Sequence, residues 1–166
     1  MKVFLILLFG LLSGSLAFAD DDHERNEAKG FAVNDNVYLQ ECGSCHLAYP
    51  PQLLAKKSWQ VIMRSLDKHF GDNAEMDKAL ATQISRFLED NAASSGFSRR
   101  SHNSASGRIT ETSYFRHEHD ELSPRHVAQN PEVKSLANCS ACHRRAKVGS
   151  FRESEIRIPG FGRWDD

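Results

Sequence analysis

The sequence predicts an all-α protein: a small helical domain on the N-terminal side, followed by a less regular C-terminal segment. Two stretches carry apolar residues at the spacing of an amphipathic helix, one beginning at Trp59 and the other at Met76. The four cysteines form two pairs, and each pair lies on a stretch short enough for one or two helical turns. We therefore expect helices that present two local sites.

The first part of the 166-residue chain has the pattern of a cleavable secretory signal peptide, residues 1–19. Lys2 supplies a positive start, an apolar run follows, and Ala17-Phe18-Ala19 offers a small-residue cleavage site before Asp20. The apolar run is too short for a typical membrane span, although an uncleaved anchor is the alternative. We expect the mature protein in the periplasm.

The remaining chain is long enough for one domain or two very small ones. We expect a first helical domain at residues 20–91 and a second segment at residues 109–166. Residues 92–108 are rich in serine, glycine and arginine, which predicts a linker or surface loop between them. The formal net charge is −1, and we expect no nucleic-acid partner.

In the first domain, Asn34 or Asp35 can cap a short helix. Ser58 is the expected cap of a second helix, which ends near Gly71. A third helix is expected from about Asp77 to Asn91.

In the second segment, Thr112 or Ser113 can cap a helix over residues 114–121. Asn138 is the expected cap of a last short helix. Residues 156–160 are expected to be extended.

Both cysteine pairs are followed directly by a histidine, in Cys42-Gly43-Ser44-Cys45-His46 and Cys139-Ser140-Ala141-Cys142-His143. This spacing is the attachment motif of a c-type haem. Each thiol can reach one vinyl group of a porphyrin, and the histidine can bind its iron. Because these motifs use all four cysteines, the sequence predicts two covalently bound haems c, held by Cys42, Cys45, Cys139 and Cys142, with His46 and His143 on the irons.

Two alternatives use the same cysteines. The two pairs could supply a four-sulfur zinc site, or the thiols could form disulfides. Neither alternative explains why a histidine follows each pair.

The second axial ligand of each iron decides whether the protein only transfers electrons or also binds a small molecule. For the first iron we expect His69, at the end of the second helix, with Met76 in reserve. For the second iron we expect His119, because it lies four residues after Phe115 and shares the helix face of that residue.

Other histidines are weaker candidates for the second iron. His117 falls on the opposite, polar face and is expected to be exposed, and His126 is a reserve ligand. His102 lies in the serine-rich loop and is also expected to be exposed.

The sequence resembles the periplasmic diheme cytochromes c (DHC) over nearly the whole mature chain. The matching stretches are Glu41-Cys42-Gly43-Ser44-Cys45-His46-Leu47-Ala48-Tyr49-Pro50-Pro51, Ser58-Trp59, His69-Phe70-Gly71-Asp72-Asn73-Ala74, Arg108-Ile109-Thr110, Ala137-Asn138-Cys139-Ser140-Ala141-Cys142-His143 and Ile156-Arg157-Ile158-Pro159.

The resemblance implies a cytochrome c-like first domain and a less regular second haem-binding segment. It also implies histidine on both sides of each haem, which favours His69 and His119 over Met76. As partners it implies a membrane b-type cytochrome and a small monohaem cytochrome.

We therefore expect an electron carrier without catalytic residues and without a small-molecule substrate. The rival hypotheses are a small peroxidase or oxidase and a gas-binding sensor, each with one open iron site.

Overall fold

The structure is a computed structural model that describes residues 31–94 and 100–164. The predicted signal peptide, residues 1–19, and part of the predicted linker lie outside these ranges. Within the described ranges no helix combines the length and the apolar character needed to cross a membrane.

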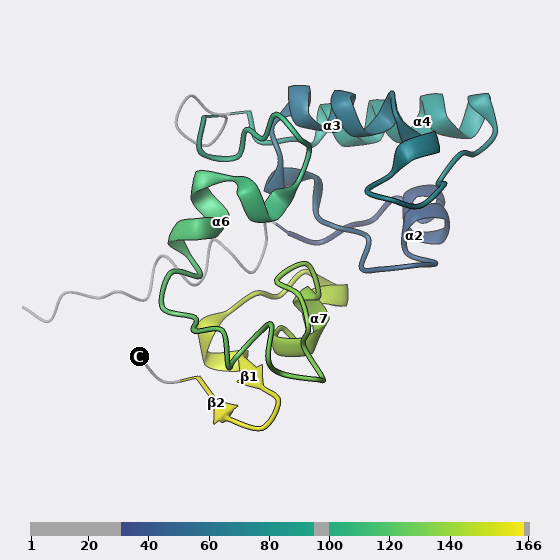
Figure 1. The fold of residues 1–166 in the computed structure, drawn as a ribbon. Coiled ribbons are helices and arrows are strands. Elements are labelled where there is room, and N and C mark those ends of the chain that lie inside the picture. Colours follow the sequence, from purple (N-terminus) through teal and green to yellow (C-terminus); the bar gives the residue numbers. More distant parts are fainter. Residues whose placement is uncertain (1–30, 95–99, 165–166) are drawn as a thin grey trace, which may run out of the picture.

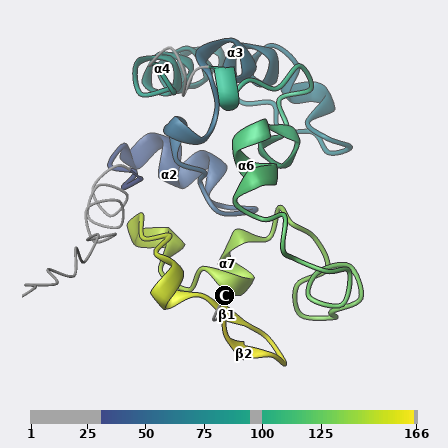
Figure 2. The ribbon, with the colours of Figure 1, turned by 90° about the vertical axis from the view of Figure 1, so that its left-hand side faces the viewer.

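Helices dominate the described chain, as the sequence predicts. The first half contributes α2 (Asn36–Cys42), α3 (Lys56–Met63) and α4 (Lys78–Asp90), and the second half contributes α6 (Ser113–His117) and α7 (Cys139–Cys142). In two perpendicular views α3 and α4 lie together at one end of the molecule and α7 lies at the other, with α6 between the two ends (Figures 1 and 2). The elements therefore form two tiers.

Short turns of 3₁₀-helix and one small hairpin complete the fold. The turns are η1 (Pro51–Leu53), η2 (Leu66–Lys68), η3 (Ile109–Glu111), η4 (Ala146–Val148) and η5 (Glu153–Glu155). Strand β1 (Arg157–Ile158) pairs antiparallel with β2 (Gly162–Arg163), with Ile158 opposite Gly162. The stretch predicted to be extended thus forms the first arm of a hairpin.

Two of the helices begin at caps that the sequence predicts, and α4 begins where the sequence predicts it. The Asp35 side chain accepts a hydrogen bond from the Tyr38 amide at 2.8 Å, and Asp77 caps α4 in the same way. The Thr112 hydroxyl accepts from the Phe115 amide at 3.1 Å. These bonds satisfy amides of the first helical turn, which have no partner within the helix.

The predicted cap at Ser58 is wrong. Helix α3 begins at Lys56, and Ser58 lies inside it, only 1 % exposed. Its hydroxyl donates to the Ser104 carbonyl oxygen at 2.9 Å and accepts from the Ser104 amide at 2.8 Å. Ser58 therefore joins α3 to a distant loop, a use that its local sequence does not reveal.

Asn138 is also not a side-chain cap, contrary to the prediction. It stands at the residue before α7, but its amide nitrogen donates to the Val133 carbonyl oxygen at 3.2 Å. The side chain thus holds the preceding turn and not the start of the helix.

The apolar core lies between α2, α3 and α4, and it confirms both predicted stripes. Trp59 and Ile62 of α3 pack in one cluster with Ile84 and Leu88 of α4 and with Tyr38 of α2. All five side chains are less than 10 % exposed, which makes this cluster the main source of hydrophobic stabilisation on this side of the molecule.

The described part of the predicted linker, residues 92–94 and 100–108, is bound to the first domain. The Ala93 amide donates to the Leu54 carbonyl oxygen, and the Ala55 amide donates to the His102 carbonyl oxygen, both at 3.0 Å. His102 is 6 % exposed and its ring stacks on Tyr114, so the predicted exposure of His102 is wrong.

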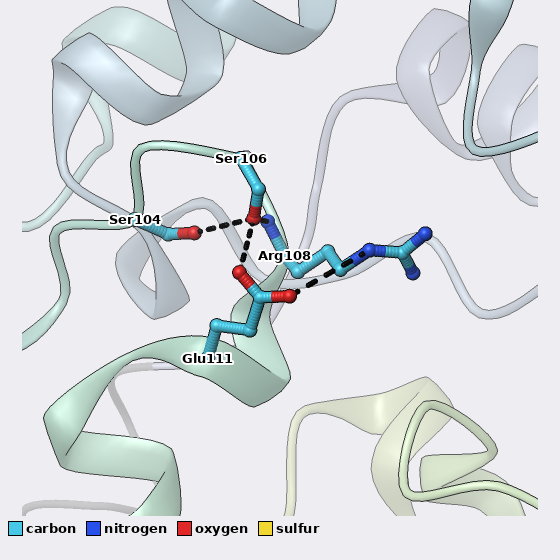
Figure 3. Close-up of polar contacts among 4 residues, drawn as sticks. All are labelled: Ser104, Ser106, Arg108 and Glu111. Carbon is cyan, nitrogen blue, oxygen red and sulfur yellow. Dashed lines mark hydrogen bonds and ion pairs between the residues drawn. The ribbon is translucent and has the colours of Figure 1, made fainter.

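A polar network shapes the end of this loop (Figure 3). The Ser106 hydroxyl contacts the Ser104 hydroxyl at 3.1 Å and donates to the Glu111 carboxylate at 2.5 Å. The same carboxylate lies 3.8 Å from Nε of Arg108, whose guanidinium covers the Phe70 ring at 4.4 Å. The loop is thereby connected to the turn that contains His69.

Replacing Ser58 by alanine should lower the free energy of unfolding by about 1–3 kcal/mol, because the buried Ser104 amide and carbonyl lose their partner. Guanidinium unfolding followed by circular dichroism measures this change. As the matched control, Ser65→Ala removes an exposed hydroxyl bond to the Val61 carbonyl oxygen and should cost less than about 0.5 kcal/mol. Equal losses for the two variants would contradict the assigned role of Ser58.

Candidate functional site

The rings of His46 and His69 face one another. Their centroids are 6.1 Å apart and their planes differ by 15°. His46 follows the end of α2 by four residues, and Cys42 is the last residue of that helix. His69 comes directly after η2, so the two rings arrive from separate parts of the first domain.

Two contacts fix the His46 ring. Nδ1 lies 2.6 Å from the Leu47 carbonyl oxygen, which can only accept, so Nδ1 carries the proton and Nε2 is free to bind a metal. The Tyr49 ring stacks on the His46 ring, with the centroids 4.8 Å apart and the planes 23° apart.

A tight turn presents His69. The Asp72 amide donates to the His69 carbonyl oxygen at 3.0 Å, and Phe70 has a φ of 52°, in the left-handed region that costs a phenylalanine free energy. The Arg108 guanidinium over Phe70 stabilises this conformation. Burial, together with the neighbouring His46, lowers the pKa of His69, which favours the neutral imidazole that a metal needs.

The second pair, His119 and His143, has the same separation. The ring centroids are 6.1 Å apart, and the planes differ by 69°. His143 follows α7 and forms a β-bridge with Ile156, next to the hairpin.

His119 lies beyond the end of α6, so the predicted helix over residues 114–121 is too long. Its Nδ1 lies 2.9 Å from the Phe115 carbonyl oxygen, the group that a continuing helix would give to the backbone amide of residue 119. The His119 ring also stacks on Phe115, with centroids 3.9 Å apart. The predicted pairing of these two residues is therefore present, but a side-chain contact maintains it instead of a helix.

Both rings of the second pair are neutral at neutral pH. Burial and, to a smaller extent, the nearby His119 lower the pKa of His143 to about 4. Burial also lowers the pKa of His119. Neutral imidazoles have a nitrogen lone pair available for a metal ion.

A cavity of about 830 Å³ opens around this second pair. This volume is in the range of roughly 300–1,000 Å³ that small-molecule and cofactor sites occupy. Cys139, Cys142, His119 and His143 all line it. Its apolar walls come from the whole length of the described chain and include Phe31, Leu53, Ile109, Phe151, Ile158 and Trp164.

All four cysteines are free, so the disulfide alternative is wrong. Burial raises the pKa of Cys42 and of Cys139 to about 11, and it also raises the pKa of Cys142. These groups are therefore thiols at neutral pH. Among residues 31–94 and 100–164 no three histidine, cysteine or acidic side chains converge as they would around a metal ion, so the four-sulfur zinc site is not formed either.

The reserve ligands have other surroundings than the paired histidines. His117 lines the same cavity as His119 and His143, but 82 % of its side chain is exposed, as the sequence predicts, and it lies 4.0 Å from Asp120. The His126 ring is buried against Phe161, and Met76 packs on the apolar core.

Two opposed imidazoles without a third protein donor fit a metal that a macrocycle already holds. An imidazole nitrogen binds a transition metal at about 2 Å, and its ring centre lies roughly 1 Å farther out, so two such ligands on one metal place their ring centroids about 6 Å apart. Both pairs have this separation, and one histidine of each pair directly follows a C-x-x-C motif. These residues could hold two c-type haems.

Sequence reasoning missed two residues of these sites. The local sequence does not show that Tyr49 stacks on His46, because this contact depends on the path of the folded chain. Phe31 lines the second cavity although it precedes the first haem motif. The one available signal for Phe31 was a large aromatic residue after a polar stretch.

Comparison with known proteins gives concordant matches. The sequence profile of a family described as dihaem cytochrome c (DHC) matches residues 38–151. No curated protein matches closely enough to count as a relative.

Two solved structures are similar to this chain. A diheme cytochrome type c from Shewanella baltica OS155 has 42 % identity and a TM-score of 0.69, with 78 % of this chain and 97 % of that chain covered. A diheme cytochrome c from Rhodobacter sphaeroides has 38 % identity and a TM-score of 0.65, with 73 % of this chain and 99 % of that chain covered.

Proposed function

Since this chain belongs to the dihaem cytochrome c family and is an electron-transfer protein with two covalently bound c-type haems, we propose that four histidines occupy all axial positions of the two irons. His46 and His69 bind the first iron, and His143 and His119 bind the second. The observation that carries this proposal is the common 6.1 Å separation of the two ring pairs.

The haems supply iron that cycles between Fe(III) and Fe(II). The four cysteines would hold the porphyrins through thioether bonds to their vinyl groups. The four histidines would stay bound to the irons in both oxidation states, which leaves no position for a substrate. Two histidine ligands also place the potentials below those of histidine/methionine haems.

We further propose that the protein acts in the periplasm, after cleavage near Ala19, and passes electrons between a membrane b-type cytochrome and a small monohaem cytochrome. The export-type sequence of residues 1–19 and the family resemblance support this proposal. Attachment of haem c outside the cytoplasm agrees with it.

Replacing His69 or His119 by alanine should convert one of the two haems, and only one, from low spin to high spin, because that iron loses an axial imidazole. Electron paramagnetic resonance of the oxidised protein counts both species. His117→Ala is the matched control, two residues from His119 and largely exposed, and should leave both haems low spin. A low-spin spectrum in both ligand variants would disprove the assignment.

The two oxidised haems should give different low-spin resonance signals. Near-parallel imidazole planes, 15° apart in the first pair, act on the same iron d orbital, whereas planes 69° apart act on two different orbitals and partly cancel. We expect the larger g anisotropy from the haem whose signal disappears in His119→Ala. Two identical signals would contradict the ring geometry.

Neither haem should bind carbon monoxide when reduced or cyanide when oxidised, because both axial positions are filled. Visible absorption spectra before and after addition measure this directly. Binding at one haem of the wild-type protein would instead support a gas-binding sensor, and turnover of peroxide at that haem would support a small peroxidase.

A further inference from the structure

Tyr49 contacts both candidate sites with one side chain. Its ring stacks on His46 with centroids 4.8 Å apart, and its hydroxyl donates to the Ala137 carbonyl oxygen at 2.8 Å. Ala137 lies two residues before Cys139, the first cysteine of the second motif. The Tyr49 side chain therefore connects the histidine of the first motif with the residues just before the second motif.

The backbone of Tyr49 is held firmly in the first domain. Its carbonyl oxygen accepts a bond from the hydroxyl of Tyr38, a core residue only 2 % exposed, at 2.7 Å. Two buried prolines follow, and the second of them, Pro51, accepts a bond from Nε1 of Trp59 at 2.7 Å. Because proline fixes its own φ and restricts the residue before it, this strap limits the backbone conformations open to Tyr49.

The other end of the contact is a turn that precedes α7. The Ala137 amide donates to the Ser135 hydroxyl at 3.1 Å. The backbone amide of Asn138 donates to the Ser135 carbonyl oxygen at 3.0 Å and closes the turn. Sγ of Cys139 lies 3.7 Å from the Ala137 carbonyl oxygen that also accepts from Tyr49. The Tyr49 hydroxyl is thus bonded to the backbone two residues before Cys139.

We propose that Tyr49 is a positioning residue for both haems: its ring sets the plane of the His46 imidazole, and its hydroxyl holds the start of α7 against the first domain. This role rests on the proposed ligation of the first iron by His46. Two separable parts of one side chain then act on two different haems, which makes the proposal testable by two substitutions.

Tyr49→Phe keeps the ring and removes the hydroxyl. In the protein with both haems attached, we expect the resonance signal and reduction potential of the first haem to match wild type, and those of the second haem to shift. Tyr49→Leu removes the ring as well, so the signal and potential of the first haem should shift too. His69→Ala and His119→Ala identify which signal belongs to which haem.

Leu88→Ala serves as the control for general loosening. Leu88 is a core residue of α4, only 1 % exposed, and it makes none of the hydrogen bonds described above for Tyr49 and its strap. We expect a lower melting temperature with both signals and both potentials unchanged. Equal shifts in Leu88→Ala and Tyr49→Phe, or wild-type signals and potentials in Tyr49→Phe, would overturn the proposal.

The failure of the proposed function would look different. A wild-type protein with a high-spin haem would refute the axial ligation before any Tyr49 variant is compared. If wild type has two low-spin haems, the Tyr49 variants test the positioning role alone.

Discussion

The distance between two opposed imidazole rings governs the architecture of this small protein. In the ligation that we propose, each iron takes one nitrogen from either side of a flat macrocycle, and the chain must bring these nitrogens together from residues far apart in sequence. The first pair joins the end of α2 to a turn after η2, and the second joins the end of α7 to a residue beyond α6. All four histidines lie outside helices. The helices thus act as supports, and the short irregular segments between them place the ligands.

These irregular segments are stabilised mainly by polar contacts with backbone groups. The Ser58 hydroxyl binds both backbone groups of Ser104, and the Tyr49 hydroxyl binds the carbonyl oxygen of Ala137. Each contact joins stretches that are distant in the chain. A chain of this length has only a limited apolar core, and such bonds connect the loops to that core without requiring further apolar surface. Residues 109–164 depend on these bonds most, because the described elements there are short helices and a hairpin whose strands have two residues each.

The features that the sequence predicts well are local ones. The caps at Asp35 and Thr112 and the start of α4 near Asp77 depend on amides within three residues. The buried faces of α3 and α4 follow from helical periodicity, so no knowledge of the tertiary fold is needed. The haem motifs are equally local. The errors at Ser58 and His102 share the opposite cause, since the burial of both residues depends on where a loop from another part of the chain is placed. His69 and His119, the expected second axial ligands, are an intermediate case. The chemistry of iron ligation limits the candidates to a few residues, but only the fold shows which rings form pairs.

The cavity around His143 is bounded by Phe31 near the start of the described chain and by Trp164 at its end. Such a site is completed by contacts of very large sequence separation, which form slowly and late because the intervening chain must first be ordered. The thiols of Cys139 and Cys142 line the same cavity, and they must be accessible when the vinyl groups reach them. A haem bound in this cavity would therefore contact segments from both ends of the described chain, and its apolar surface would become part of the hydrophobic core of this half of the protein.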